Sequence, residues 1–144
     1  MKKITIYSDG SSLGNPGPGG WGTILEFNGH QKELSGGDPH TTNNKMELLG
    51  VIKGLEALKE PCDVKIISDS KYVVQAINEW LVNWKKNNWK TAGKKPVKNQ
   101  ELWQKYLKVS KQHKIEAIWV KGHAGHEFNE RCDILAKNEA EKLR

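Results

Sequence analysis

Two short apolar runs of the sequence end in the same pair of residues, a serine followed by an aspartate. The first run begins at Ile4 and ends at Asp9, and the second begins at Val64 and ends at Asp69. Both have the length and the β-branched content of a strand, and a turn signal follows each. If the two strands belong to one sheet, they deliver two carboxylates to the edge where open α/β sheets place their sites.

Two further acidic residues are expected to border the core. Glu47 lies in a predicted helix that follows the capping candidates of residues 41–44 and runs to about residue 59. Within that helix Glu47 stands one turn before Val51, which belongs to the apolar stripe. Asp133 lies on the apolar face of the last predicted helix, so it too is expected at the margin of the core.

Each of these acids also has a simpler explanation when it is taken alone. Glu47 is consistent with a solvated helical glutamate, and Asp69 with a helix cap. Gathered in one place, Asp9, Glu47, Asp69 and Asp133 would repel one another unless they were protonated or bound a cation. A ligand set made only of carboxylate oxygens suits Mg²⁺ or Mn²⁺ rather than zinc. A pair of such ions roughly 4 Å apart can activate water and stabilise a leaving oxygen in phosphoryl displacement.

A histidine near these acids is a candidate proton carrier. His123 stands in a predicted loop over residues 121–127 that contains two glycines. An ordinary surface histidine remains the alternative. His123, His126 and Cys132 are close enough in sequence to suggest zinc, but their order is not that of a metalloprotease and no fourth ligand has a suitable spacing.

The positive charge of the chain is concentrated in one segment. The formal net charge is +6, from 23 basic and 17 acidic residues. Residues 80–100 contain six lysines and no acid, so the rest of the chain has 17 residues of each sign. Trp80, Trp84 and Trp89 are interleaved with these lysines, which is typical of a surface that binds a nucleic-acid backbone. Core tryptophans beside a solvated lysine face are the alternative.

The order of the predicted elements indicates an α/β fold. We expect a five-stranded mixed sheet, with three antiparallel and two parallel strands, and helices on both of its faces. Gly50 and Gly54 would weaken the helix that carries Glu47 unless that helix lies close against a strand. The predicted elements are a strand ending at residue 9, a glycine-rich turn over 10–22, hairpin strands over 23–27 and 30–35 joined by Asn28-Gly29, a break of the sheet at 36–39, the helix ending near 59, a strand ending at 69, a helix from about 70 that turns Val73, Val74, Ile77 and Leu81 inward, a helix over 100–111 that turns Leu102, Tyr106 and Val109 inward, a strand over 115–120, and a helix from about 127 to 144.

Length and composition predict one cytoplasmic domain. A chain of 144 residues can bury a core without disulfides or metals. No apolar run approaches the roughly 18 residues of a membrane span, and no leader peptide is recognisable. The two cysteines, Cys62 and Cys132, form no metal-binding or redox pair and are expected to be reduced and buried.

Seven separated motifs, in order along nearly the whole chain, resemble bacterial ribonuclease H of type 1. They are Tyr7-Ser8-Asp9-Gly10-Ser11, Gly14-Asn15-Pro16-Gly17-Pro18-Gly19-Gly20, Thr41-Thr42-Asn43-Asn44-Lys45-Met46-Glu47-Leu48, Ser68-Asp69-Ser70-Lys71-Tyr72, Asn83-Trp84-Lys85-Lys86, Val120-Lys121-Gly122-His123-Ala124-Gly125-His126 and Asn129-Glu130-Arg131-Cys132-Asp133. The resemblance implies a metal-dependent endonuclease that cuts the RNA strand of an RNA–DNA hybrid and leaves 5′-phosphate and 3′-hydroxyl ends. We expect a monomer as the default oligomeric state.

The resemblance also assigns residues to roles. It implies that Asp9, Glu47, Asp69 and Asp133 bind Mg²⁺, with Mn²⁺ as a possible substitute and two ions in the substrate complex, and that His123 assists proton transfer or product departure. It places Asn15 and Thr42 near a phosphate of the DNA strand, and it makes the segment from Trp80 to Lys98 a basic protrusion that holds that strand. The residues expected to contact the hybrid are Gly10, Asn15, Thr42, Asn43, Asn44, Lys71, Trp80, Trp84, Lys85, Lys86 and Trp89.

Two positions depart from the pattern of the family. Lys71 stands where the best-known members have glutamine, so a contact in the minor groove could become a contact with a phosphate. His40 stands where some members have arginine, which could weaken the phosphate pocket or make it sensitive to pH. Two alternatives remain: a hybrid-binding module of the same fold without catalysis, and a related nuclease that acts on DNA junctions or strand ends.

Overall fold

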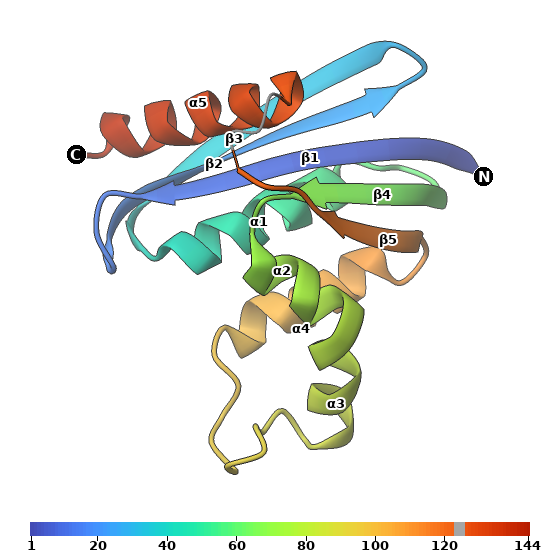
Figure 1. Ribbon diagram of the computed structural model, residues 1–144, viewed down its shortest axis with the longest axis vertical. Helices are drawn as coiled ribbons and strands as arrows, with labels where there is room; N and C mark the ends of the chain where they lie inside the picture. The colour runs from blue at the N-terminus through green and yellow to red at the C-terminus, as the bar shows by residue number, and fades with distance from the viewer. Residues whose placement is uncertain (123–125) are drawn as a thin grey trace.

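The computed structural model describes residues 1–122 and 126–144 of the chain. Five strands form a single sheet in the order β3-β2-β1-β4-β5 (Figure 1). The elements along the chain are β1 (Lys2–Ser12), β2 (Gly17–Phe27), β3 (His30–Thr41), α1 (Asn43–Glu56), β4 (Cys62–Ser68), α2 (Lys71–Gln75), the π-helical turn η1 (Ala76–Trp80), α3 (Leu81–Lys86), α4 (Gln100–Ser110), β5 (Lys114–Trp119) and α5 (Glu127–Lys142).

The predicted α/β architecture is confirmed. β1, β2 and β3 pair antiparallel, whereas β4 pairs parallel to β1 on one side and to β5 on the other. α5 covers one face of the sheet, and α1 and α4 lie on the opposite face (Figure 1). β1 and β4 therefore run side by side and end at the same edge, as the repeated Ser-Asp ending predicted.

The glycine-rich stretch after Asp9 is strand rather than turn for most of its length, so the predicted turn over residues 10–22 was wrong. β1 continues to Ser12 and β2 begins at Gly17. A Cβ atom on Gly20 or Gly22 would collide with the backbone of α5. These glycines allow a helix to approach the sheet closely. In the sequence alone, the same glycines are indistinguishable from turn residues.

The third strand also extends beyond its prediction. Residues 36–39 were expected to break the sheet, but β3 continues through them to Thr41. Gly36 packs against the indole of Trp21, and Gly37 and Asp38 pair with β2. Pro39 is tolerated because β3 is an edge strand, where one side of the backbone needs no partner in the sheet.

The hairpin turn and the close approach of α1 agree with the sequence predictions. Asn28 and Gly29 have φ values of 47° and 81°, the two positive angles that a type I′ turn requires. Gly54 packs against Ile6 and Thr23, and the Thr23 hydroxyl donates to the Gly50 carbonyl at 2.7 Å. The two glycines thus allow α1 to lie directly on β1 and β2.

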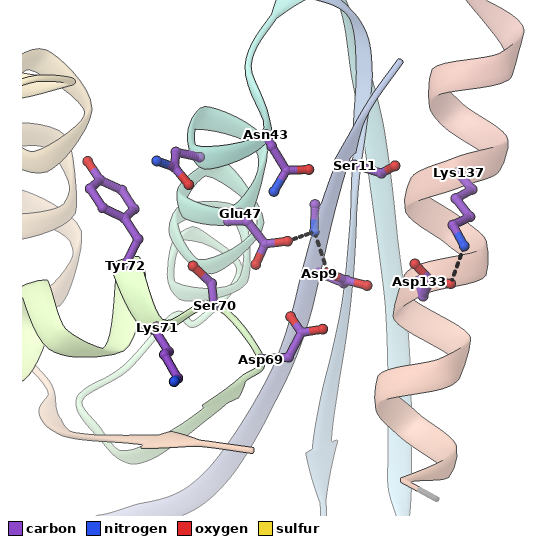
Figure 2. A pocket seen from close by; sticks show the side chains of 12 residues that line it. Asp9, Ser11, Asn43, Glu47, Asp69, Ser70, Lys71, Tyr72, Asp133 and Lys137 are labelled. Atoms are coloured by element: carbon purple, nitrogen blue, oxygen red, sulfur yellow. Dashed lines mark hydrogen bonds and ion pairs between the residues drawn. The ribbon is translucent and has the colours of Figure 1, made fainter. Parts of the chain in front are cut away.

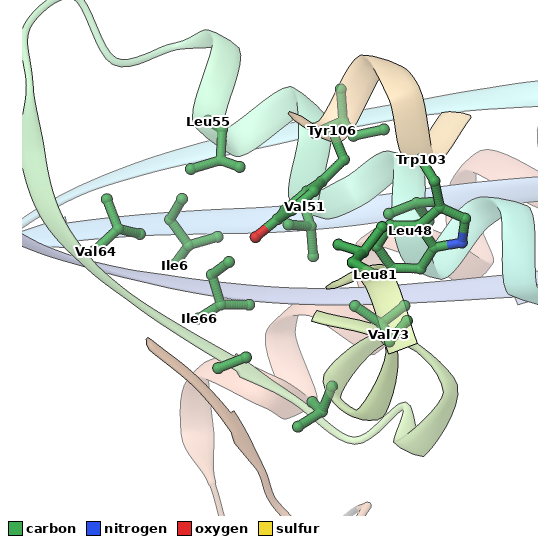
Figure 3. Packing of buried hydrophobic residues seen from close by; sticks show 14 of the residues in the cluster. Ile6, Leu48, Val51, Leu55, Val64, Ile66, Val73, Leu81, Trp103 and Tyr106 are labelled. Carbon is green, nitrogen blue, oxygen red and sulfur yellow. The ribbon is translucent and has the colours of Figure 1, made fainter. Parts of the chain in front are cut away.

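The main core lies between the sheet and the layer formed by α1, α2 and α4 (Figure 3). Trp103 is its largest fully buried side chain. The prediction for α4 was partly wrong: Tyr106 is buried as expected, but Leu102 and Val109 are only half-buried and Trp103 and Ser110 take the central positions. Both cysteines are free and buried, as predicted. Within the described ranges, we find no helix with the length and apolar character of a membrane span.

Candidate active site

Asp9 lies near the end of β1, where the backbone of the next residue binds two acids at once. The Gly10 N–H donates to Asp9 Oδ1 at 2.9 Å and to Glu47 Oε1 at 2.6 Å (Figure 2). A side chain at Gly10 would collide with the backbone of Met46 and Glu47. Only glycine allows β1 and α1 to meet so closely that one amide fixes both carboxylates.

Glu47 is carried by the second turn of α1 and is 4% exposed. The helix is capped by Thr42, whose Oγ1 accepts from the Lys45 N–H at 3.3 Å. Glu47 Oε2 has no hydrogen-bond partner within the described part of the chain. The expectation that Glu47 borders the core is confirmed, and a buried carboxylate oxygen without a partner indicates a ligand.

Asp69 follows the end of β4 and completes a cluster of three acids. Ser70, rather than Asp69, caps α2, because its hydroxyl accepts from the Val73 N–H at 3.2 Å. Asp69 is therefore not needed as a helix cap. One carboxylate oxygen from each of Asp9, Glu47 and Asp69 lies within 4.8 Å of the other two.

Asp133 lines the same pocket but lies outside this cluster of three. It is on α5, where its Oδ2 is 3.0 Å from the ammonium of Lys137, one turn further along the helix (Figure 2). The structure therefore brings three of the four predicted acids close enough together to share one metal ion. The fourth, Asp133, lines the same pocket and forms an ion pair with Lys137. The pocket has a volume of about 450 Å³ and is also lined by polar residues, namely Ser11, Asn43, Asn44, Ser70, Lys71, Tyr72 and Lys137.

The protonation of the cluster is strongly perturbed. Burial raises the pKa of Asp9 from 3.8 to about 7, and the charges of Asp69 and Asp133 add to this rise, whereas the hydrogen bond from the Gly10 N–H opposes it. Burial also raises the pKa of Glu47 well above its ordinary value, and the Asp9 carboxylate raises it further. Such buried like charges are stable only when they share protons or bind a cation.

The donor set fits a hard divalent cation. Three carboxylates converge, and one buried oxygen, Glu47 Oε2, lacks a protein partner among the described residues. Oxygen ligands of this kind suit Mg²⁺ or Mn²⁺. Cys132, one of the three residues considered as zinc ligands, is buried, and its thiol donates to the Tyr7 carbonyl at 3.4 Å. This argues against a zinc site. Burial raises the pKa of the Cys132 thiol to about 12, which keeps it protonated. His123, the predicted proton carrier, lies outside the described residues.

The other residues of the capping segment form a second hollow beside the first. The Asn43 N–H donates to Asn15 Oδ1 at 3.0 Å, which ties the loop after β1 to the start of α1. This pocket has a volume of about 390 Å³, and Asn43 and Asn44 line both hollows. Its lining residues are Asn15, Thr42, Asn43, Asn44, Lys45, Lys98 and Asn99. Lys45 and Asn99 also line this hollow, although the sequence analysis did not name either of them as a contact residue.

The tryptophans and lysines of the basic segment play different structural parts. Trp80 and Trp84 are half-buried, and their rings contact each other at an interplanar angle of 43°, with ring centroids 5.9 Å apart. They also pack against Tyr72 and Trp103 respectively. Lys85 and Lys86, by contrast, are exposed at the end of α3. The indoles thus anchor the protrusion to the core, and the ammonium groups face solvent. Trp89 is half-buried and Lys71 is exposed at the rim of the carboxylate pocket.

Comparison with known proteins gives a consistent result along the chain. The family model for RNase H matches residues 1–141. A ribonuclease H of Campylobacter concisus is 59% identical over 144 residues, which are 100% of this chain and 96% of that one. The crystal structure of LC9-RNase H1, a type 1 RNase H, matches with a TM-score of 0.89 and 32% identity over 100% of this chain and 74% of its own. LC11-RNase H1 in complex with an RNA/DNA hybrid matches with a TM-score of 0.74 and 25% identity, over 96% of this chain and 97% of that one. This chain belongs to the ribonuclease H family.

Proposed function

We propose that this protein is a metal-dependent endonuclease that hydrolyses the RNA strand of RNA–DNA hybrids and leaves 5′-phosphate and 3′-hydroxyl ends. The observation that carries this proposal is the convergence of Asp9, Glu47 and Asp69 at one sheet edge in a chain of the ribonuclease H family. The related LC11-RNase H1 binds an RNA/DNA hybrid in its crystal structure, which supports the same substrate here.

Asp9, Glu47 and Asp69 are the proposed ligands of Mg²⁺, with Mn²⁺ as a substitute, and Asp133 is the proposed fourth ligand when two ions bind with the substrate. When bound, the metal supplies activation of the attacking water and stabilisation of the leaving oxygen. The Gly10 amide holds the carboxylates of Asp9 and Glu47 in position before any ion arrives. Burial disfavours their ionised forms in the free protein, so the cation and the ionised cluster stabilise each other.

The hybrid is proposed to lie across both hollows and the basic protrusion. Asn15 and Thr42 would hold a phosphate of the DNA strand in the second hollow, where Lys98 and Lys45 supply positive charge. Gly10, Asn43 and Asn44 border the carboxylate pocket and would face the RNA strand, where a 2′-hydroxyl distinguishes RNA from DNA. The proposed role of His123 is proton transfer or assistance of product departure. The residues proposed to hold the DNA strand further along are Trp80, Trp84, Lys85, Lys86 and Trp89.

The remaining features of the proposal concern the working form. We infer one domain, residues 1–144, that acts as a monomer and includes the protrusion over residues 80–98. We also place the protein in the cytoplasm, which suits two cysteines that are free and buried.

A binding module without catalysis is the second candidate, and one observation weighs against it. A protein that only binds a phosphate backbone has no use for three acids crowded beside it, because they repel the ligand.

The test is cleavage of one end-labelled RNA presented as a hybrid, as a single strand and as an RNA duplex. Each substrate is incubated with Mg²⁺, with Mn²⁺ and with EDTA. We expect cutting of the hybrid alone, only with a divalent cation, and products whose 5′-phosphate and 3′-hydroxyl ends a ligase can rejoin without further treatment. Tight hybrid binding with no cutting under any metal would make the protein a binding module. Equal cutting of the single strand would remove the assignment of substrate class.

A further inference from the structure

Trp119 ends β5 directly beside the carboxylate cluster. It pairs with Ser68 at the end of β4, and its indole N–H donates to the backbone carbonyl of Asp69 at 3.0 Å. The last backbone hydrogen bond between the two strands runs from the Val120 N–H to the Ser68 carbonyl at 3.0 Å, and the indole hydrogen bond extends the connection to Asp69. Trp119 therefore restrains the peptide that carries a proposed metal ligand.

The face of the same indole is used by a second residue of the site. The Lys71 ammonium lies 4.9 Å from the centroid of the Trp119 ring, a cation–π geometry. Lys71 follows Asp69 by two positions and lines the carboxylate pocket, on the same side as Asp69 (Figure 2). Among the described residues Lys71 forms no ion pair, although four acids line the pocket. The indole, and not a carboxylate, holds this charge.

We propose that Trp119 is a positioning residue for the reaction, with two separable effects. Through its N–H it fixes the backbone of Asp69, and through its ring it holds the Lys71 ammonium at the rim of the pocket for a phosphate of the RNA strand next to the one that is cut. This inference rests on the proposed function, because it identifies residues that serve the same site.

A phosphate is the ligand that suits Lys71 best. An ammonium has three donors and no acceptor, so it cannot read a base edge in the way that an amide does. Resting on an indole reduces the freedom of a long side chain, and the lysine then loses less entropy when an anion arrives. An anion on the rim of the pocket that holds the carboxylate cluster would be a phosphodiester of the strand that enters the pocket.

Three variants separate the two effects. Lys71→Met removes the charge and keeps the alkyl chain. Trp119→Phe keeps an aromatic face and removes the N–H, and Trp119→Leu removes both. Lys111→Met is the matched control, because it removes one charge just before the opposite end of β5. Circular dichroism and thermal unfolding check that each variant folds. If Trp119→Leu does not fold, Lys71→Met and Trp119→Phe still test the two effects.

The first readout is hybrid binding in EDTA as a function of salt. For Lys71→Met we expect a dissociation constant about fivefold higher at low salt and a slope of log K against log salt that is smaller by about one. Trp119→Leu should also weaken binding, and adding Lys71→Met to it should have less effect than in the wild type, because the two residues act as a pair. A Lys71→Met slope equal to that of Lys111→Met would overturn the phosphate contact.

The second readout is Mg²⁺ binding to the free protein by calorimetry, which needs no substrate. Trp119→Phe should weaken Mg²⁺ binding about threefold to tenfold, as the loss of one hydrogen bond predicts, and should lower kcat while KM for the hybrid stays within about twofold. Lys71→Met should instead raise KM more than it lowers kcat. Unchanged Mg²⁺ affinity in Trp119→Phe would overturn the positioning of Asp69. If the wild type failed to cut hybrids, the proposed function would fall, and the Mg²⁺ titration would still decide this effect.

Discussion

Replacing Asp9 by asparagine should stabilise the metal-free protein at neutral pH while it removes activity. The folded protein raises the pKa of Asp9 to about 7, chiefly by burial, whereas the unfolded chain has the ordinary value of 3.8. Between these values the folded chain holds a proton that the unfolded chain has released. The free energy of unfolding therefore falls as the pH rises through this range.

The size of the effect follows from the two pKa values. Across the pH range between the two pKa values, 3.8 and about 7, the folded chain holds up to one more proton at Asp9, so stability falls by about 1.4 kcal/mol for each pH unit, or roughly 4 kcal/mol in all. The raised pKa of Glu47 acts in the same direction. An asparagine side chain cannot ionise, so at pH 8 Asp9→Asn should be more stable than the wild type by about 4 kcal/mol, which corresponds to a melting temperature roughly 10 °C higher.

The assay is thermal and urea unfolding in EDTA, followed by circular dichroism, at pH 5, 6, 7 and 8. Asp63→Asn is the control, because Asp63 lies near the start of β4, away from the cluster at its end. We expect the difference in free energy of unfolding between Asp9→Asn and the wild type to increase as the pH rises. Saturating Mg²⁺ should remove this difference by stabilising the wild type alone. Stability curves that run parallel at every pH would refute the reasoning.

Two further predictions concern the protrusion and the junction of β1 with α1. Changing Lys85 and Lys86 together to glutamine should weaken hybrid binding and reduce its salt slope by about two, with little effect on kcat, when compared with the same change at Lys108 and Lys111; an unaltered slope would mean that these lysines are only solvated. Gly10→Ala should lose about 3 kcal/mol of stability and most activity, because its Cβ would displace the backbone of α1. Gly93→Ala is the control: its Cβ would lie 3.9 Å from the Thr91 hydroxyl, so this variant should unfold and cleave like the wild type.

The acid cluster could be predicted from the sequence because short patterns of neighbouring residues determine where each acid lies in its strand or helix. Ser-Asp at the end of an apolar run places Asp9 near the end of β1 and Asp69 just after β4, and parallel strands end at the same edge. Glu47 could be placed at the core margin by helical period alone. The positive angles at Asn28-Gly29 followed from the same kind of short-range rule.

What the sequence could not predict depends on partners far along the chain. Gly20 and Gly22 look like turn residues, and only the position of α5 more than 100 residues later makes them strand. Trp119 stands in no motif, and its partner, the Asp69 carbonyl, is 50 residues away. The sequence did not single out Trp103, because Leu102 and Val109 form an equally apolar face of the same helix. Only the sheet and α1 determine which face is buried.

The central claim is that the carboxylate cluster is a metal site that cuts RNA in hybrids. The most direct measurement is single-turnover cleavage of one labelled hybrid by the wild type and by Asp69→Asn, with Mg²⁺ and with EDTA, alongside hybrid binding by both proteins. We predict that cleavage falls to background in the variant and in EDTA, while the variant folds and binds the hybrid. Cleavage at a near-normal rate by Asp69→Asn, or by the wild type in EDTA, would contradict the account.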